Sequence, residues 1–237
     1  SENFFSFTRT CKDVMTIIAY NWSAQNILFK CIQKPNNPVL YVKKLLLNDK
    51  IYDYLTVQFP NCTCLNLKYT IKVESIIIII KQSNLTTLNI SNIDIKPEGA
   101  IAIAKEIPQS QLTCLYLSCC HIGTEGIIAI AEVLHQSKLT ELDLTYNQIG
   151  LNGLNAIIME LPKCKLTFLD LSVNEIGCDG AISIAKVLHD CNLTHLNLFS
   201  NNIRSNGATA IAKVLPNCKL ISLGLSANWI YHEGKDR

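Results

Sequence analysis

The 237-residue sequence lacks the features by which membrane, secreted and nucleic-acid-binding proteins are usually recognised. Its most hydrophobic block, Ile76 to Ile80, falls far short of the roughly 18 apolar residues that cross a bilayer. The N-terminal segment SENFFSFTRT has neither a cationic start nor a long apolar core, so we expect no signal peptide. A net charge of +2 without a basic run predicts no general attraction for nucleic acid. We therefore expect binding to neither membranes nor nucleic acid.

Catalytic and metal-binding motifs are missing as well. The chain has no G-x-S-x-G, no P-loop, no H-E-x-x-H and no C-x-x-C pair. Its 11 cysteines are odd in number, which favours reduced thiols in a cytosol-like compartment over a disulfide framework, although the pairing of individual cysteines stays open. We predict no enzyme activity, no cofactor and no metal site, and a monomer located in the cytoplasm.

An internal repeat is the strongest signal that is present. The segment LTELDLTYNQIG recurs in related form at a step of 27 residues, beginning at Leu85, Leu112, Leu139, Leu166, Leu193 and Leu220. Alternating leucines predict a short strand, and the helix-forming segments that follow, such as AISIAKVL, predict a helix. A glycine occupies the same position in all six repeats, at Gly99, Gly126, Gly153, Gly180, Gly207 and Gly234. It suits either a crowded helix entry or an unusual backbone angle.

The pattern L-x-x-L-x-L-x-x-N/C-x-L/I with a helical second half resembles the leucine-rich repeats of the ribonuclease-inhibitor-like class. The resemblance runs from Leu85 to Arg237. It implies an α/β solenoid, with a parallel sheet on the concave face and helices on the convex face. One such unit cannot bury its own apolar face, whereas stacked units share a continuous core.

The chain upstream of Leu85 carries a weaker form of this pattern. Residues 39–84 predict two degenerate repeats. The first has Val42, Leu45 and Leu47 in its strand. The second has a strand near Cys64–Tyr69, whose inward pair is either Leu65 and Leu67 or Leu67 and Tyr69, and ESIIIIIKQSN takes its helix slot. Residues 1–38 predict a helical N-terminal cap, because terminal repeats expose a core edge. Residues 85–237 predict six regular repeats, the last truncated at YHEGKDR, so a longer parent protein is plausible.

One position of the repeat, just after each predicted strand, is usually polar although the pattern around it is apolar. We call this position the ladder slot. Five of its members are predicted to form a structural ladder, in which each side chain bonds backbone groups left unpaired at the turn: Cys120, Asn147, Asn174, Asn201 and Asn228. The sixth member, Ile93, cannot form such bonds and predicts a looser turn. Asparagine or cysteine in this role is also what the family resemblance implies.

The residues between the strand leucines are predicted to face the concave side, where the repeat leaves their identity free. The first row is Thr87, Cys114, Glu141, Phe168, His195 and Ser222, and the second is Asn89, Tyr116, Asp143, Asp170, Asn197 and Gly224. Tyr146 and Phe199 flank these rows, and Trp229 lies just beyond the last ladder asparagine. We predict a partner-binding surface at Tyr116, Glu141, Asp143, Tyr146, Phe168, Asp170, His195 and Phe199. A paired-carboxylate hydrolase site is disfavoured there, because the face is open to water.

The sequence thus predicts a non-enzymatic module that binds a protein with a basic patch on its concave face. Three alternatives stay open: a bacterial effector that binds a protein in the host cytosol, the sensor or autoinhibitory region of a larger receptor or enzyme, and a ribonuclease inhibitor. Abundant isoleucine, asparagine and lysine suggest an AT-rich genome. The link to effectors comes from the family resemblance, because repeats of this eukaryote-like class are common in bacterial effectors. A ribonuclease inhibitor favours an acidic face along the whole solenoid, and this face is acidic only in its middle.

Overall fold

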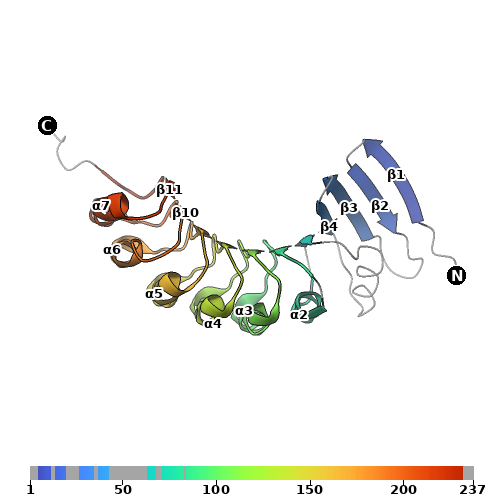
Figure 1. The fold of residues 1–237 in the computed structure, drawn as a ribbon, viewed down its shortest axis with the longest axis horizontal. Coiled ribbons are helices and arrows are strands. Elements are labelled where there is room, and N and C mark those ends of the chain that lie inside the picture. Colours follow the sequence, from blue (N-terminus) through green and yellow to red (C-terminus); the bar gives the residue numbers. More distant parts are fainter. Residues whose placement is uncertain are drawn as a thin grey trace.

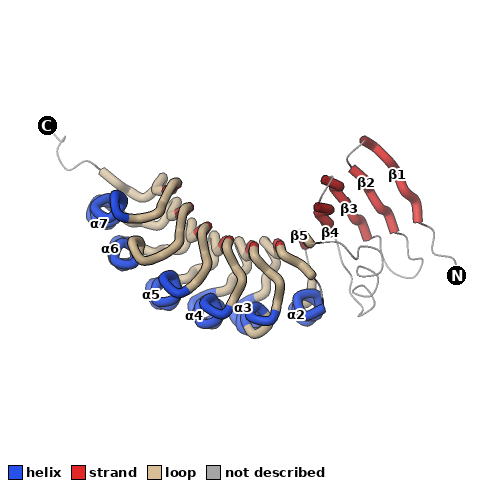
Figure 2. The backbone as a smooth tube through the Cα atoms, in the orientation of Figure 1, coloured by secondary structure: helices blue, strands red, loops and turns tan. Residues whose placement is uncertain are grey.

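Each 27-residue step forms one coil of strand, turn and helix in the computed structural model, which describes residues 5–11, 14–19, 27–34, 37–42, 63–67, 71–82 and 84–231. The coils stack into a curved solenoid, with the strands on the inner side of the arc and the helices on the outer side (Figures 1 and 2). This arrangement confirms the α/β leucine-rich-repeat fold that the sequence predicts.

The solenoid strands are short and lie in one parallel sheet in chain order. They are β5 (Cys64–Leu67), β6 (Thr87–Asn89), β7 (Cys114–Tyr116), β8 (Glu141–Asp143), β9 (Phe168–Asp170), β10 (His195–Asn197) and β11 (Ser222–Gly224). From β6 onward the register is one full repeat, so that Glu141 lies opposite Phe168, and Asp143 opposite Asp170. Equivalent side chains of successive repeats therefore form straight rows across the sheet.

The helices pack side by side on the convex face. They are α2 (Val73–Gln82), α3 (Lys96–Ala104), α4 (Gly123–Val133), α5 (Gly150–Glu160), α6 (Gly177–Val187) and α7 (Arg204–Val214). Four of them end in 3-10 turns, at Ile107–Gln109, Leu134–Gln136, Leu161–Lys163 and Leu215–Asn217. None of the described helices is long and apolar enough to cross a membrane.

A single apolar core runs between the sheet and the helices. Leu142 and Leu144 of one repeat and Leu169 and Leu171 of the next are buried almost completely. Full burial of one such side chain contributes about 1.5–3 kcal/mol. Since these leucines belong to one core that runs through all the described coils of the solenoid, this stabilisation depends on stacking and not on any single repeat.

The glycines that keep one phase through the repeats mark places where neighbouring helices touch. A Cβ atom on Gly207 would lie 2.7 Å from Ile203 Cγ2 and 2.9 Å from Ala181 Cβ in the preceding helix. Gly153 is crowded in the same way by Ile127 and Ile149. Of the two reasons that the sequence left open, crowding is therefore the correct one for this column.

Positive φ angles occur instead three residues earlier, at the first residue of each helix from α3 to α7. Gly123, Gly150 and Gly177 have φ between 63° and 71° there, and Lys96 and Arg204 hold the same slot at φ 60°. Glycine adopts this conformation without the steric conflict that other residues meet. The helices thus begin one turn before the residues that the sequence pattern highlights.

The expectation of a helical cap at residues 1–38 is wrong for the part that the structure describes. This part forms four strands: β1 (Phe5–Cys11), β2 (Val14–Ala19), β3 (Ile27–Lys34) and β4 (Asn37–Val42). Neighbours among β1 to β4 pair antiparallel, and β4 pairs parallel with β5. The segment VMTIIA is rich in β-branched residues, which favour strands, and pairing between neighbouring strands outweighs the weak helical pattern in this region.

The two degenerate repeats also differ in detail from the prediction. Leu40 and Val42 of β4 pair with Leu65 and Leu67 of β5, so Leu40 occupies the position expected for Leu45. Leu45, Leu47 and Tyr69 lie outside the described residues. Leu65 and Leu67 are both buried, which settles the register of β5, and α2 occupies the helix slot as predicted.

A column of small polar residues closes the 3-10 turns. Ser110 and Ser137 donate their hydroxyls to Ile107 O and Leu134 O at 2.8 Å. Cysteine thiols make the corresponding bond in the later repeats, at Cys164, Cys191 and Cys218. Burial raises the pKa of the Cys164 and Cys191 thiols, so they stay protonated near neutral pH. None of the eight cysteines whose side chains the structure describes forms a disulfide.

Candidate protein-binding surface

The polar slot at the strand ends is filled by a buried hydrogen-bond ladder. Asn147 is fully buried; its Nδ2 donates to Leu117 O of the previous coil at 2.7 Å and to Leu144 O of its own coil at 3.0 Å. Its Oδ1 accepts from the N–H groups of Cys120 and Ile122. The same bonds to the previous coil recur at Asn174, Asn201 and Asn228. These amides satisfy backbone groups of two coils at once, and none of them faces a ligand.

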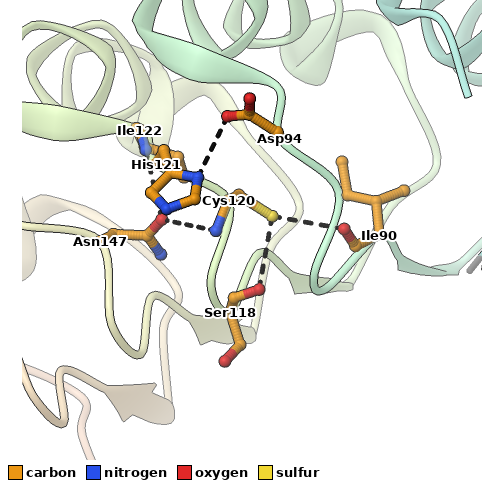
Figure 3. Close-up of polar contacts among 7 residues, drawn as sticks. All are labelled: Ile90, Asp94, Ser118, Cys120, His121, Ile122 and Asn147. Carbon is orange, nitrogen blue, oxygen red and sulfur yellow. Dashed lines mark hydrogen bonds and ion pairs between the residues drawn. The ribbon is translucent and has the colours of Figure 1, made fainter. Parts of the chain in front are cut away.

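Cys120 ends the ladder on the N-terminal side (Figure 3). Its thiol donates to Ile90 O at 3.3 Å and to Ser118 O at 3.5 Å, which replaces part of the bonding of an asparagine. Burial raises the pKa of this thiol to about 12, so it acts as a neutral donor and not as a nucleophile. In the coil before it, Ile93 is buried, and its N–H bonds Ile90 O within its own turn.

The predicted concave residues form adjacent rows on the inner face of the sheet. In β6 to β9 the central leucine is buried and its two neighbours are partly exposed. The structure therefore brings six of the eight predicted binding residues together on the four neighbouring strands β7 to β10: Tyr116, Glu141, Asp143, Phe168, Asp170 and His195. No lysine or arginine occupies either row in β5 to β11.

Side-chain contacts link these residues across the strands. The hydroxyl of Tyr116 donates to Glu141 Oε2 at 2.6 Å, and the rings of Phe168 and His195 lie 6.2 Å apart between centroids. Burial raises the pKa of Tyr116, and its bond to the Glu141 carboxylate raises it further. Tyr116 is thus a fixed neutral donor, which holds Glu141 in place on the face.

Side chains of the second row also accept hydrogen bonds within the turn that follows each strand, a structural role that the sequence did not predict. Oδ1 of Asp143 and Asp170 accepts the N–H two residues further on, from Thr145 at 2.9 Å and Ser172 at 2.8 Å. Asn89 and Asn197 make the equivalent bond. A short side chain with an acceptor oxygen is therefore preferred here, and the recurrence of Asn and Asp was the signal for it. Where the turn uses such an acceptor, the choice between a neutral amide and a carboxylate stays free, and Tyr116 and Gly224 show that the acceptor is not obligatory.

The carboxylate of Asp143 is costly for the fold. Burial raises the pKa of Asp143, and repulsion from Asp170 adds to the effect, although the bonds from Thr145 act in the opposite direction. Oδ2 of Asp170 accepts a bond from Asn197 Nδ2 at 2.8 Å. An asparagine would serve the turn equally well without the charge, as Asn89 and Asn197 do.

We expect Asp143→Asn to raise the free energy of unfolding at neutral pH by less than about 1 kcal/mol. Because the folded-state pKa is raised, the ionised carboxylate opposes folding, and this penalty is lost as pH falls through that pKa. The gain should therefore vanish under acidic conditions, where both side chains are uncharged. Urea denaturation of both proteins across pH measures it; a variant that is less stable at neutral pH would contradict the expectation.

The remaining two predicted residues lie at the rim where the strands end. Tyr146 is 51% exposed and Phe199 is 44% exposed. Tyr146 also has a positive φ of 57°, in a slot beside the ladder where other repeats place small or polar residues such as Asn92 and Ser200. Exposed aromatic rings of this kind are typical of protein contacts. No cluster of metal-binding side chains occurs among the residues that the structure describes.

Comparisons with known proteins agree with this architecture. A family model described as leucine rich repeat matches five segments, at residues 81–104, 110–131, 135–157, 163–185 and 189–212. Among solved structures, the chain is similar to "Leiomodin-1 Actin-Binding Site 2 (ABS2)", with a TM-score of 0.54 and 20% identity over 63% of this chain and 90% of that chain. At this identity the likeness shows the fold alone. Comparison with curated proteins finds no significant match.

Proposed function

Since the chain belongs to the leucine-rich-repeat family, we propose that it is a non-enzymatic module that binds a partner protein on the concave face of its sheet. The observation that carries the proposal is the composition of that face. Three carboxylates lie on two adjacent strands beside the Tyr116 and Phe168 rings, and neither row contains a lysine or arginine in β5 to β11. Rows of outward-facing residues on a rigid sheet are well suited to display such a surface.

The partner that fits is a protein with a basic segment flanked by apolar side chains. Glu141, Asp143 and Asp170 attract lysine or arginine and steer its approach, whereas Phe168 and Tyr116 supply apolar area. The raised pKa of Asp143 supports this assignment, because a charge that opposes folding is retained where an asparagine would serve the turn. The similar leiomodin-1 segment is described as an actin-binding site, which makes a protein the class of partner to test first.

We expect the double variant Asp143→Asn, Asp170→Asn to lower partner binding at least tenfold, because both carboxylates are lost while the turn acceptors remain. The single variant Phe168→Ala should do the same through lost apolar contact. The measurement is quantitative affinity capture from lysates on immobilised wild-type and variant chains.

A charge-matched control uses the convex face. Glu125 and Glu132 of α4 are exposed, and the variant Glu125→Gln, Glu132→Gln changes the net charge equally. Capture should survive this change, and circular dichroism should find all variants folded. If folded concave-face variants still capture the same proteins at wild-type levels, the concave face is not the binding surface.

A further inference from the structure

A second candidate site lies at the C-terminal end of the described solenoid, beyond the concave rows. An open cavity of about 700 Å³ is present there. Its lining residues come from the turn before α7, the first turn of α7 and the segment after β11: Asn202, Arg204, Ser205, Asn206, Trp229 and Tyr231. None of them belongs to the surface described above.

Trp229 is a large aromatic residue at a position where the preceding coils have polar or charged residues. Its slot follows the ladder residue and is exposed in every preceding regular coil, where it holds Asp94, His121, Gln148, Glu175 and Asn202. Since the slot is exposed even between two coils, further stacking does not explain an apolar residue there. Trp229 is 62% exposed, and its positive φ, 54°, is shared by His121, Gln148, Glu175 and Asn202 in the same slot. The large exposed aromatic ring, and not the backbone conformation, therefore sets Trp229 apart, and an exposed ring of this kind indicates binding.

Tyr231 makes the tryptophan part of a pair. The two rings lie 6.2 Å apart between centroids at 51°, and Tyr231 is 64% exposed. Its backbone is held by Ser205, whose Oγ donates to Tyr231 O at 2.8 Å and accepts from Tyr231 N–H at 3.2 Å. This brace fixes the segment after β11 against the start of α7. The two rings are thus presented from a supported backbone.

The charge of the cavity selects the class of ligand. Among the described residues that line it, Arg204 is the only charged one, and it is exposed. Among the described residues, no ion pair involves Arg204, and no carboxylate lines the cavity. The start of α7 adds positive potential to that of the guanidinium. Trp, Tyr and Arg are the residues enriched in protein-binding hot spots, and Asn and Ser commonly surround them.

We propose that this cavity is a second binding site, for a peptide segment that carries a carboxylate beside an aromatic or aliphatic side chain. The apolar group packs on Trp229 and Tyr231, and the carboxylate pairs with Arg204. The side-chain amides of Asn202 and Asn206 bond the peptide backbone. The ligand is opposite in charge to the basic segment proposed for the concave face, so the two surfaces are distinguishable.

The test is selection of short random peptides displayed on phage against the whole immobilised chain, followed by titration of the enriched peptides. Two variants probe the site. Trp229→Gln installs the residue that the same slot holds at Gln148, and Arg204→Glu reverses the charge. The matched control is Gln148→Ala, and the variant Asp143→Asn, Asp170→Asn reports on the concave face.

The expected result is a set of peptides with Asp or Glu next to an apolar residue. Their affinity should fall at least tenfold in Trp229→Gln and Arg204→Glu and stay unchanged in both control variants. Enrichment of basic peptides that respond only to the concave-face variant would leave the proposed function standing and overturn this site. Absence of any peptide sensitive to Trp229→Gln would also overturn it. The site would likewise be overturned if a neutral oligosaccharide, tested without peptide, bound in a way that depends on Trp229.

Discussion

Asn174→Leu is expected to lower the free energy of unfolding by about 3–5 kcal/mol, since each buried polar group left unpaired costs about 1–3 kcal/mol. Asn174 is fully buried, and its Oδ1 accepts from Asn147 N–H at 2.9 Å and from Ile149 N–H at 3.4 Å. Its Nδ2 donates to three carbonyl oxygens, including Leu144 O of the previous coil at 2.9 Å. Leucine has a similar volume but satisfies none of these groups.

Chemical denaturation measures the total loss, and amide hydrogen exchange locates it. The Asn147 and Ile149 amides should lose protection first, because their acceptor is removed. Asn174→Cys is the matched control, since Cys120 fills the same slot by donating to a carbonyl of the previous coil; it should lose clearly less than the leucine variant. If the leucine variant is within about 1 kcal/mol of wild type, the ladder does not hold the coils together as we infer.

Gly153→Val is expected to destabilise the protein by about 3 kcal/mol, the upper end of the usual penalty for overpacking. A Cβ atom there would collide with Ile127 of α4 and lie 2.9 Å from Ile149 Cγ2. Both neighbours are fully buried and have no free space to move into. Because the clash separates α4 from α5, the denaturation transition should also broaden as coupling between adjacent repeats weakens.

Gly177 supplies the contrast for this prediction. An added Cβ would meet nothing within 4 Å, but the residue has φ 71°. Gly177→Ala should therefore cost about 1 kcal/mol through backbone strain and leave the transition sharp. Equal effects of the two substitutions would mean that crowding does not decide the glycine column.

The repeat architecture could be predicted from the sequence because it depends on short sequence features that recur at a fixed spacing. The step of 27 residues, the leucines and the ladder slot each recur, and every copy repeats the same prediction. A chance arrangement does not keep six copies in phase. The leucine-rich-repeat solenoid with its outward-facing rows follows from this periodicity together with the family resemblance.

The N-terminal region could not be predicted in the same way because it does not repeat. Strands β1 to β4 depend on pairing with one another and on the parallel contact of β4 with β5. Local pattern is a weak guide where non-local pairing decides between strand and helix. The register of β4, with Leu40 in place of Leu45, is set by the same parallel pairing.

Two features of the proposed binding surfaces were decided by tertiary structure alone. The sequence placed Asp143 and Asp170 on the concave face, but only the folded turns reveal that each also accepts a bond from a backbone N–H, which favours Asn or Asp there. The cavity beside Trp229 requires residues from two coils that are separated in sequence and joined by the Ser205 bonds. Periodicity determines which side chains the solenoid displays, whereas contacts between neighbouring coils determine which of them are free to bind.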